Sequence, residues 1–194
     1  MTQRHSVGNL ATLLLALLTC ATLASAQQRP LLTAAPALSV QEPDEWIKYT
    51  SPEGRYNVLL PGRPTVSTKA ASAEGASLTQ YRAALFDAAV GYMIGYFDYT
   101  ETMTFSLDGA RDGMIEAVKG TLLAEKSISL AGYPGRELRV LAKDVSGTEF
   151  LTRARYYDIN RRVYVVQFII PKSAEAESEA KASKYFDSFQ VVKK

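Results

Sequence analysis

Short hydrophobic runs separated by turn residues fill the chain from residue 46 onward. Aromatic and branched side chains mark the runs that predict strands, which are 46–49, 56–60, 78–86, 90–99, 122–130, 135–142, 148–157 and 163–170. Proline, glycine and acidic residues lie between them, as in the segments 51–54 and 61–64. The short segment 158–162 is typical of a turn between antiparallel strands. The pattern therefore predicts a mainly antiparallel sheet.

The run 163–170 differs from the others because it is apolar at both alternating sets of positions, with Gln167 as the exception. A strand of this kind buries both of its faces. We therefore expect it to lie in the centre of the sheet, covered on both sides.

Two segments have the spacing of helices that supply this cover. The first begins after Ser106, a favourable N-cap, and has a helical stripe at three- and four-residue spacing: Leu107, Ala110, Met114, Ala117, Val118 and Thr121. Gly109 and Gly113 lie four apart, which permits close packing against a sheet. The second runs from about Ser173 to Phe186, and its predicted docking stripe is Ala182, Tyr185, Phe186 and Phe189. The predicted fold is α+β: an antiparallel sheet of about six or seven strands with helices packed on its faces.

The N-terminal segment is typical of an export signal. Arg4 precedes a charge-free run from Leu10 to Leu18, and small residues at Ala24 and Ala26 favour cleavage after Ala26. Residues 1–26 are therefore predicted to be a signal peptide. Two alternatives stay open: retention of the run as a membrane anchor, and lipidation at Cys20, which lies in a segment that resembles a lipobox.

Residues 27–43 are predicted to be a linker. Pro30, Pro36 and Pro43 remove amide donors and favour extended backbone, so a regular helix or central strand is not expected there. The folded domain is predicted to span residues 44–194.

The composition says little about the fold, but it excludes several classes of ligand and catalytic site. The 194-residue chain has 22 basic and 20 acidic side chains, so its net charge favours neither nucleic acid nor a strongly anionic surface. His5 and Cys20 are the only residues of their kinds, and both lie in the predicted leader. After cleavage, the domain lacks the residues for a Ser-His-Asp triad, a thiol nucleophile or an imidazole or thiolate zinc site. We predict no cofactor.

Acidic residues offer one candidate catalytic site. Asp98 lies among aromatic residues with Glu101 close by, and two carboxylates can act as general acid and base or bind a sugar. The alternative is that Asp98 only marks a strand end. Asp108 and Asp112 lie four apart on the first predicted helix, where an exposed acidic face is favoured over a cation site.

Basic and aromatic residues around the last hairpin form the best candidate binding surface, which comprises Arg153, Arg155, Tyr157, Arg161 and Arg162. Alternation places the first three on one strand face and the other two in or beside the turn. Such a surface suits an anionic glycan, a lipid headgroup or an acidic envelope protein. The alternative is a solvated face whose arginines pair with nearby acids.

The segment WIKYTSPEGRYNVLLPGRP at residues 46–64 resembles the opening of PsbP-like domains, and KYFDSFQV at residues 184–191 resembles their closing helix and strand. The resemblance implies a Mog1/PsbP-type α/β/α sandwich. Domains of this fold include photosystem subunits, a binder of a nuclear-transport GTPase and bacterial envelope lipoproteins. The resemblance therefore implies the fold of this chain but does not imply its function. No motif in this sequence allows a metal-binding or partner-binding residue of these domains to be assigned to a position of this chain.

These observations lead us to expect an exported, noncatalytic binding or accessory domain of the cell envelope, periplasmic or extracellular. Its partner would be an envelope protein, a glycan or a lipid headgroup, with no nucleic acid, and it would reach a membrane only through an N-terminal anchor if one is retained. The alternative function is an extracytoplasmic enzyme that uses carboxylates or tyrosine, acting on carbohydrate.

Overall fold

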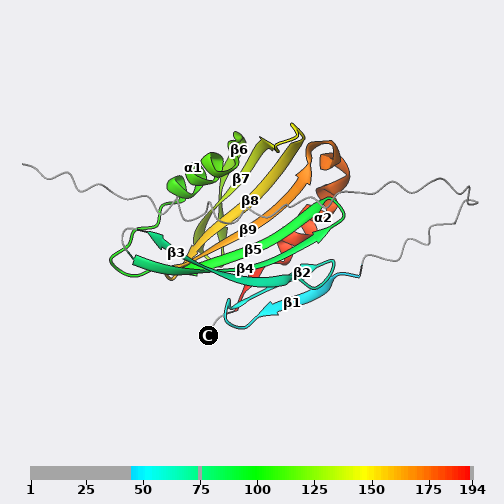
Figure 1. Cartoon of the computed structure of the whole chain (residues 1–194). Helices are drawn as coiled ribbons and strands as arrows, with labels where there is room; N and C mark the ends of the chain where they lie inside the picture. The colour runs from blue at the N-terminus through cyan, green and yellow to red at the C-terminus, as the bar shows by residue number, and fades with distance from the viewer. Residues whose placement is uncertain (1–44, 74–75, 193–194) are drawn as a thin grey trace, which may run out of the picture.

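The computed structural model describes residues 45–73 and 76–192 (Figure 1). The predicted signal peptide, Cys20 and the whole of the predicted linker lie outside these residues. No helix in the described ranges is long and apolar enough to cross a bilayer.

Seven antiparallel strands form the main sheet, in the order β3-β4-β5-β9-β8-β7-β6. The strands are β3 (Thr65–Ala73), β4 (Ala76–Asp87), β5 (Val90–Asp98), β6 (Thr121–Leu130), β7 (Tyr133–Lys143), β8 (Glu149–Ile159) and β9 (Arg162–Pro171). Strand β9 lies fourth of seven, which confirms that the doubly apolar run is the central strand. Strand β3 was not predicted, because its sequence TVSTKAASA carries little apolar volume.

The first two predicted strands form a separate sheet. Strands β1 (Ile47–Ser51), β2 (Tyr56–Leu60) and β10 (Gln190–Val191) pair in the order β1-β2-β10. Two long-range hydrogen bonds hold this small sheet in place. The amide of Leu59 donates to the Ser188 hydroxyl oxygen at 2.9 Å, and the Tyr164 hydroxyl donates to the carbonyl oxygen of Gly54 at 2.8 Å.

Helix α1 (Leu107–Val118) covers one face of the main sheet (Figure 1). The predicted N-cap is confirmed, since the Ser106 hydroxyl oxygen accepts a hydrogen bond from the amide of Gly109 at 3.2 Å. Gly109 and Gly113 are both buried, as close packing on the sheet requires. Met114 lies in a core with residues of β5, β7, β8 and β9.

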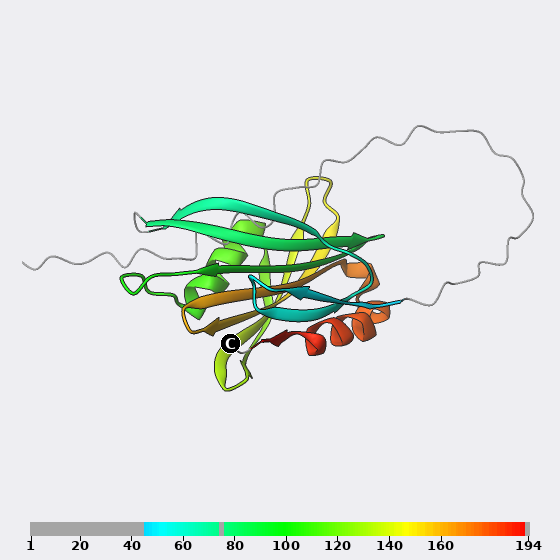
Figure 2. The same ribbon diagram turned by 90° about the horizontal axis from the view of Figure 1, so that it is seen from below.

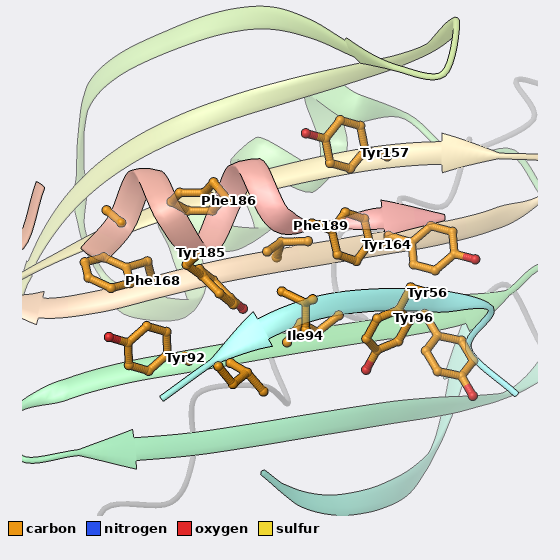
Figure 3. Packing of buried hydrophobic residues seen from close by; sticks show 14 of the residues in the cluster. Tyr56, Tyr92, Ile94, Tyr96, Tyr157, Tyr164, Phe168, Tyr185, Phe186 and Phe189 are labelled. Carbon is orange, nitrogen blue, oxygen red and sulfur yellow. The ribbon is translucent and has the colours of Figure 1, made fainter. Parts of the chain in front are cut away.

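Helix α2 (Glu175–Ser188) follows a short 3-10 turn (Lys172–Ala174) and covers the opposite face together with the small sheet (Figure 2). Tyr185, Phe186 and Phe189 point from this segment toward the sheet (Figure 3). The hydroxyl of Tyr185 donates to the carbonyl oxygen of Met93 at 3.0 Å. The result is the predicted α/β/α sandwich, with the small sheet as an addition to one outer layer.

Candidate functional site

Arg153 and Arg155 lie on the face of β8 that α2 covers, as the alternation predicted. Arg153 donates two hydrogen bonds to the carboxylate of Glu179 on α2, at 2.8 and 2.9 Å. Both guanidinium groups lie over the ring of Phe186, at 5.4 Å for Arg153 and 4.6 Å for Arg155. The two arginines therefore connect the sheet to the helix.

Glu137 lies at the centre of a group of basic side chains on this part of the sheet. Its residue is 9% exposed, and its carboxylate accepts a hydrogen bond of 2.6 Å from Arg155 Nε. Arg153 and Lys126 complete the surrounding cations, at 3.6 and 3.2 Å. Burial alone raises the pKa of Glu137, but the hydrogen bonds and charges of Arg155 and Lys126 outweigh it and lower the pKa.

A groove of about 390 Å³ runs beside α2 over this network. Its lining residues are Ala124, Glu125, Lys126, Glu137, Leu138, Arg139, Arg153, Glu175 and Glu179. Arg139 also pairs with Glu175 across the groove. Because acids and bases here pair with one another, the groove presents no excess of positive charge to an anionic ligand.

The remaining residues of the predicted basic surface lie elsewhere. Tyr157 is 4% exposed and its ring stacks on Phe189, with centroids 6.1 Å apart. Arg162 is 7% exposed, and Arg161 in the β8–β9 turn is open to solvent. The five predicted residues therefore do not form one exposed surface, and the arginines pair with acids as the alternative interpretation held.

The predicted acidic site is divided between two ion pairs. Both oxygens of Asp98 accept hydrogen bonds of 2.6 Å from Arg162, the residue directly opposite on β9. Glu101 pairs with Arg161 at 2.5 Å. A bidentate guanidinium fixes the orientation of a carboxylate. Asp98 and Glu101 are thus each directed toward a cation of the protein.

The two acidic residues of α1 that the sequence analysis noted also form ion pairs with arginines. Asp112 pairs with Arg111 at 2.8 Å, and Asp108 pairs with Arg136 and with Arg111. Across residues 45–73 and 76–192, no group of three histidine, cysteine or acidic side chains is arranged to hold a metal ion.

A second hollow was missed by the sequence interpretation. We call it the tyrosine cleft, a cavity of about 350 Å³ lined by Tyr49, Ser51, Glu53, Tyr56, Val66, Thr68, Tyr81, Arg82, Ala83 and Tyr96. It lies where the small sheet meets strands β3, β4 and β5 of the main sheet. The rings of Tyr81 and Tyr96 stack with centroids 4.7 Å apart and planes 3° from parallel. The sequence carried no local signal for it, because its walls come from two sheets and five strands.

The ring of Tyr96 is enclosed on both sides. Tyr81 covers one face, and the guanidinium of Arg162 lies 4.6 Å from the ring centroid. Tyr56 is 1% exposed and packs edge to face against Tyr96 (Figure 3). Tyr49 and Tyr81 are only half-buried, so they are the aromatic rings of the cleft that a ligand reaches.

Comparison with solved structures shows the fold. The solution structure of cyanobacterial PsbP (CyanoP) from Synechocystis matches with a TM-score of 0.51 and 13% identity, covering 80% of this chain and 98% of that chain. This likeness confirms the predicted PsbP-like fold. LpqN, described as involved in cell envelope biogenesis of Mycobacterium tuberculosis, matches with a TM-score of 0.43 and 10% identity, over 78% of this chain and 80% of LpqN. A Pseudomonas aeruginosa protein of unknown function matches with a TM-score of 0.40 and 12% identity, over 71% and 91%.

No protein-family model matches the sequence, and no curated protein matches it.

Proposed function

We propose that this protein is an exported, noncatalytic binding or accessory domain of the cell envelope. The observation that carries the proposal is the pairing of the candidate catalytic acids. Asp98 pairs with Arg162, and Glu101 pairs with Arg161. Glu137, which the sequence analysis did not single out, pairs in the same way with Arg155. Each of these carboxylates is directed toward a guanidinium group of the protein, which argues against its use as a general acid or base.

Two further features support the proposal. The sequence from Leu10 to Ala26 has the pattern of a cleaved export signal, and the only histidine and cysteine of the chain lie within residues 1–26. The tyrosine cleft is a concave hollow in which four tyrosines and a few polar groups meet, and small-ligand sites commonly combine these features.

Comparison of native and denatured intact masses tests this function. The full chain is expressed in its own host with a C-terminal affinity tag and purified gently from the envelope fraction. We expect a denatured mass that begins at Gln27 and a larger native mass, because a ligand or partner stays bound without a covalent bond.

The same experiment identifies the competing outcomes. An acylated mass beginning at Cys20 would keep the envelope assignment and place the domain on a membrane through lipid chains. A full-length polypeptide found only in the cytoplasm, with identical native and denatured masses, would contradict the proposed function.

A further inference from the structure

We propose that the tyrosine cleft binds an organic ammonium group, with Glu53 as its counter-ion and the half-buried rings of Tyr49 and Tyr81 as its aromatic walls. The inference rests on the proposed binding function and names the chemical class of the ligand. Neither predicted site contained these three residues.

The charge of the cleft is the first argument. Glu53 is exposed at the β1–β2 turn, and among the described residues its carboxylate has no ion-pair or hydrogen-bond partner. This distinguishes it from Asp98, Glu101 and Glu137, which all pair with arginines. The cleft therefore presents a negative charge that a cationic ligand can neutralise.

The negative charge acts on the aromatic walls. Burial is the main cause that raises the pKa of Tyr49, and the charge of Glu53 raises it further. Burial also raises the pKa of Tyr96 to about 12, although the nearby Arg162 lowers it, and Glu53 again contributes in the raising direction. The field of Glu53 thus reaches Tyr49, which is one wall of the cleft, and Tyr96, which lies behind the other wall.

The two arginines nearby do not cancel this charge. Arg162 is neutralised by its bidentate bond to Asp98 and lies against Tyr96. Arg82 also lines the cleft. It lies between Tyr81 and Ala83 on β4, so alternation along the strand directs its side chain away from the face that carries the ring of Tyr81.

The turn that carries Glu53 is fixed by the main sheet. Arg162 Nη1 donates to the carbonyl oxygen of Glu53 at 2.7 Å, and the Tyr164 hydroxyl donates to that of Gly54 at 2.8 Å. A Cβ atom at Gly54 would lie 2.5 Å from the ring of Tyr56, so a larger residue does not fit there. The backbone at Glu53 is therefore fixed before a ligand binds, so that only the Glu53 side chain has to be ordered on binding.

The aromatic rings supply the second attraction. The faces of aromatic rings are negative, and a substituted ammonium group is favourable over them because it is large and weakly hydrated. Tyr81 backs onto Tyr96 in a parallel stack, so its ring is held still. The exposed side chain of Val66 also lines the cleft and provides an apolar surface for the methyl or methylene groups around the nitrogen.

Calorimetric titration of the purified full-chain product with choline tests the inference. The neutral probe is 3,3-dimethylbutanol, which has the shape of choline without its charge, and maltose is the saccharide probe. We expect saturable binding of choline and at least about tenfold weaker binding of the neutral analogue, since only the cation gains the Glu53 attraction.

Glu53→Gln is the main variant, because it keeps the size of an exposed side chain and the backbone contact to Arg162. We expect it to weaken choline binding about tenfold. Glu116→Gln removes the same charge from an exposed position on α1, on the other face of the main sheet, and should leave binding unchanged. Tyr81→Leu, checked for folding by circular dichroism, should also weaken binding.

Vesicles separate the two sources of the ammonium group. Binding to phosphatidylcholine vesicles but not to phosphatidylglycerol vesicles assigns it to a lipid headgroup, and binding of free choline without vesicle binding assigns it to a soluble ligand. Equal affinity for choline and 3,3-dimethylbutanol, equal effects of the two Gln variants, or absence of choline binding at millimolar concentration overturns the inference. Saturable maltose binding without choline binding would reject the ligand class and leave the binding function standing.

Discussion

Replacing Tyr185 with alanine is expected to destabilise the fold by about 3 to 5 kcal/mol, the usual cost of emptying a large aromatic site in a core. Tyr185 has no solvent exposure and joins α2 to the main sheet. Its ring packs against Tyr92, Phe168 and Phe186, with centroids between 5.2 and 6.3 Å away. Denaturant unfolding monitored by circular dichroism measures the loss.

The matched control for this change is Tyr185→Phe. It keeps the ring and removes only the hydroxyl that donates to the carbonyl oxygen of Met93, so we expect a loss of about 1 kcal/mol. If the alanine variant were no less stable than the phenylalanine variant, α2 would not be packed on the sheet as described.

Replacing Glu137 with leucine is the second large change, expected to cost about 2 to 3 kcal/mol because it leaves the largely buried Arg155 without its closest partner. The side chains of Glu137 and Arg155 are 11% and 18% exposed. A double variant, Glu137→Leu with Arg155→Met, should recover most of the loss, since the largely buried guanidinium group is then removed together with its carboxylate. Chemical denaturation of the four proteins gives the coupling energy. A double variant that loses as much as the two single changes added together would show that the pair is not coupled.

The contribution of Glu137 also depends on pH. Its pKa in the folded protein lies below the ordinary value of 4.5, so the folded state favours the carboxylate. The stabilisation is fully present above the unfolded-state pKa and is lost as the pH falls through the folded-state pKa. The stability difference between the wild type and Glu137→Gln should therefore be constant near neutrality and shrink below about pH 4.5.

The sequence predicts those parts of the fold that depend on local pattern. The apolar run of β9 identified the central strand, and Ser106 identified the start of α1. The second sheet was not predictable in this way, because the pairing of β2 with β10 joins residues 57 and 190. Strand β3 was missed for a different reason: it is an edge strand with small and polar residues, and such a strand resembles a loop.

Which residues meet in a candidate site depends on the pairing register of the strands. The local sequence pattern does not determine that register. Asp98 and Arg162 were assigned to two different sites, yet they lie opposite each other in the β5–β9 ladder. Tyr81 and Tyr96 are likewise paired in register between β4 and β5, which produces their stack. Whether two residues on neighbouring strands lie opposite each other can be predicted only when the register of those strands is known.

The central claim is that the paired carboxylates are structural and the domain acts by binding. The most direct measurement is product formation: the purified protein is incubated with glycans extracted from the host envelope, and the mixture is followed by mass spectrometry beside the Asp98→Asn and Glu101→Gln variants. The account predicts the same product profile for all three proteins and for buffer alone. A product that accumulates with the wild type and is absent with a folded Asp98→Asn or Glu101→Gln variant would contradict it.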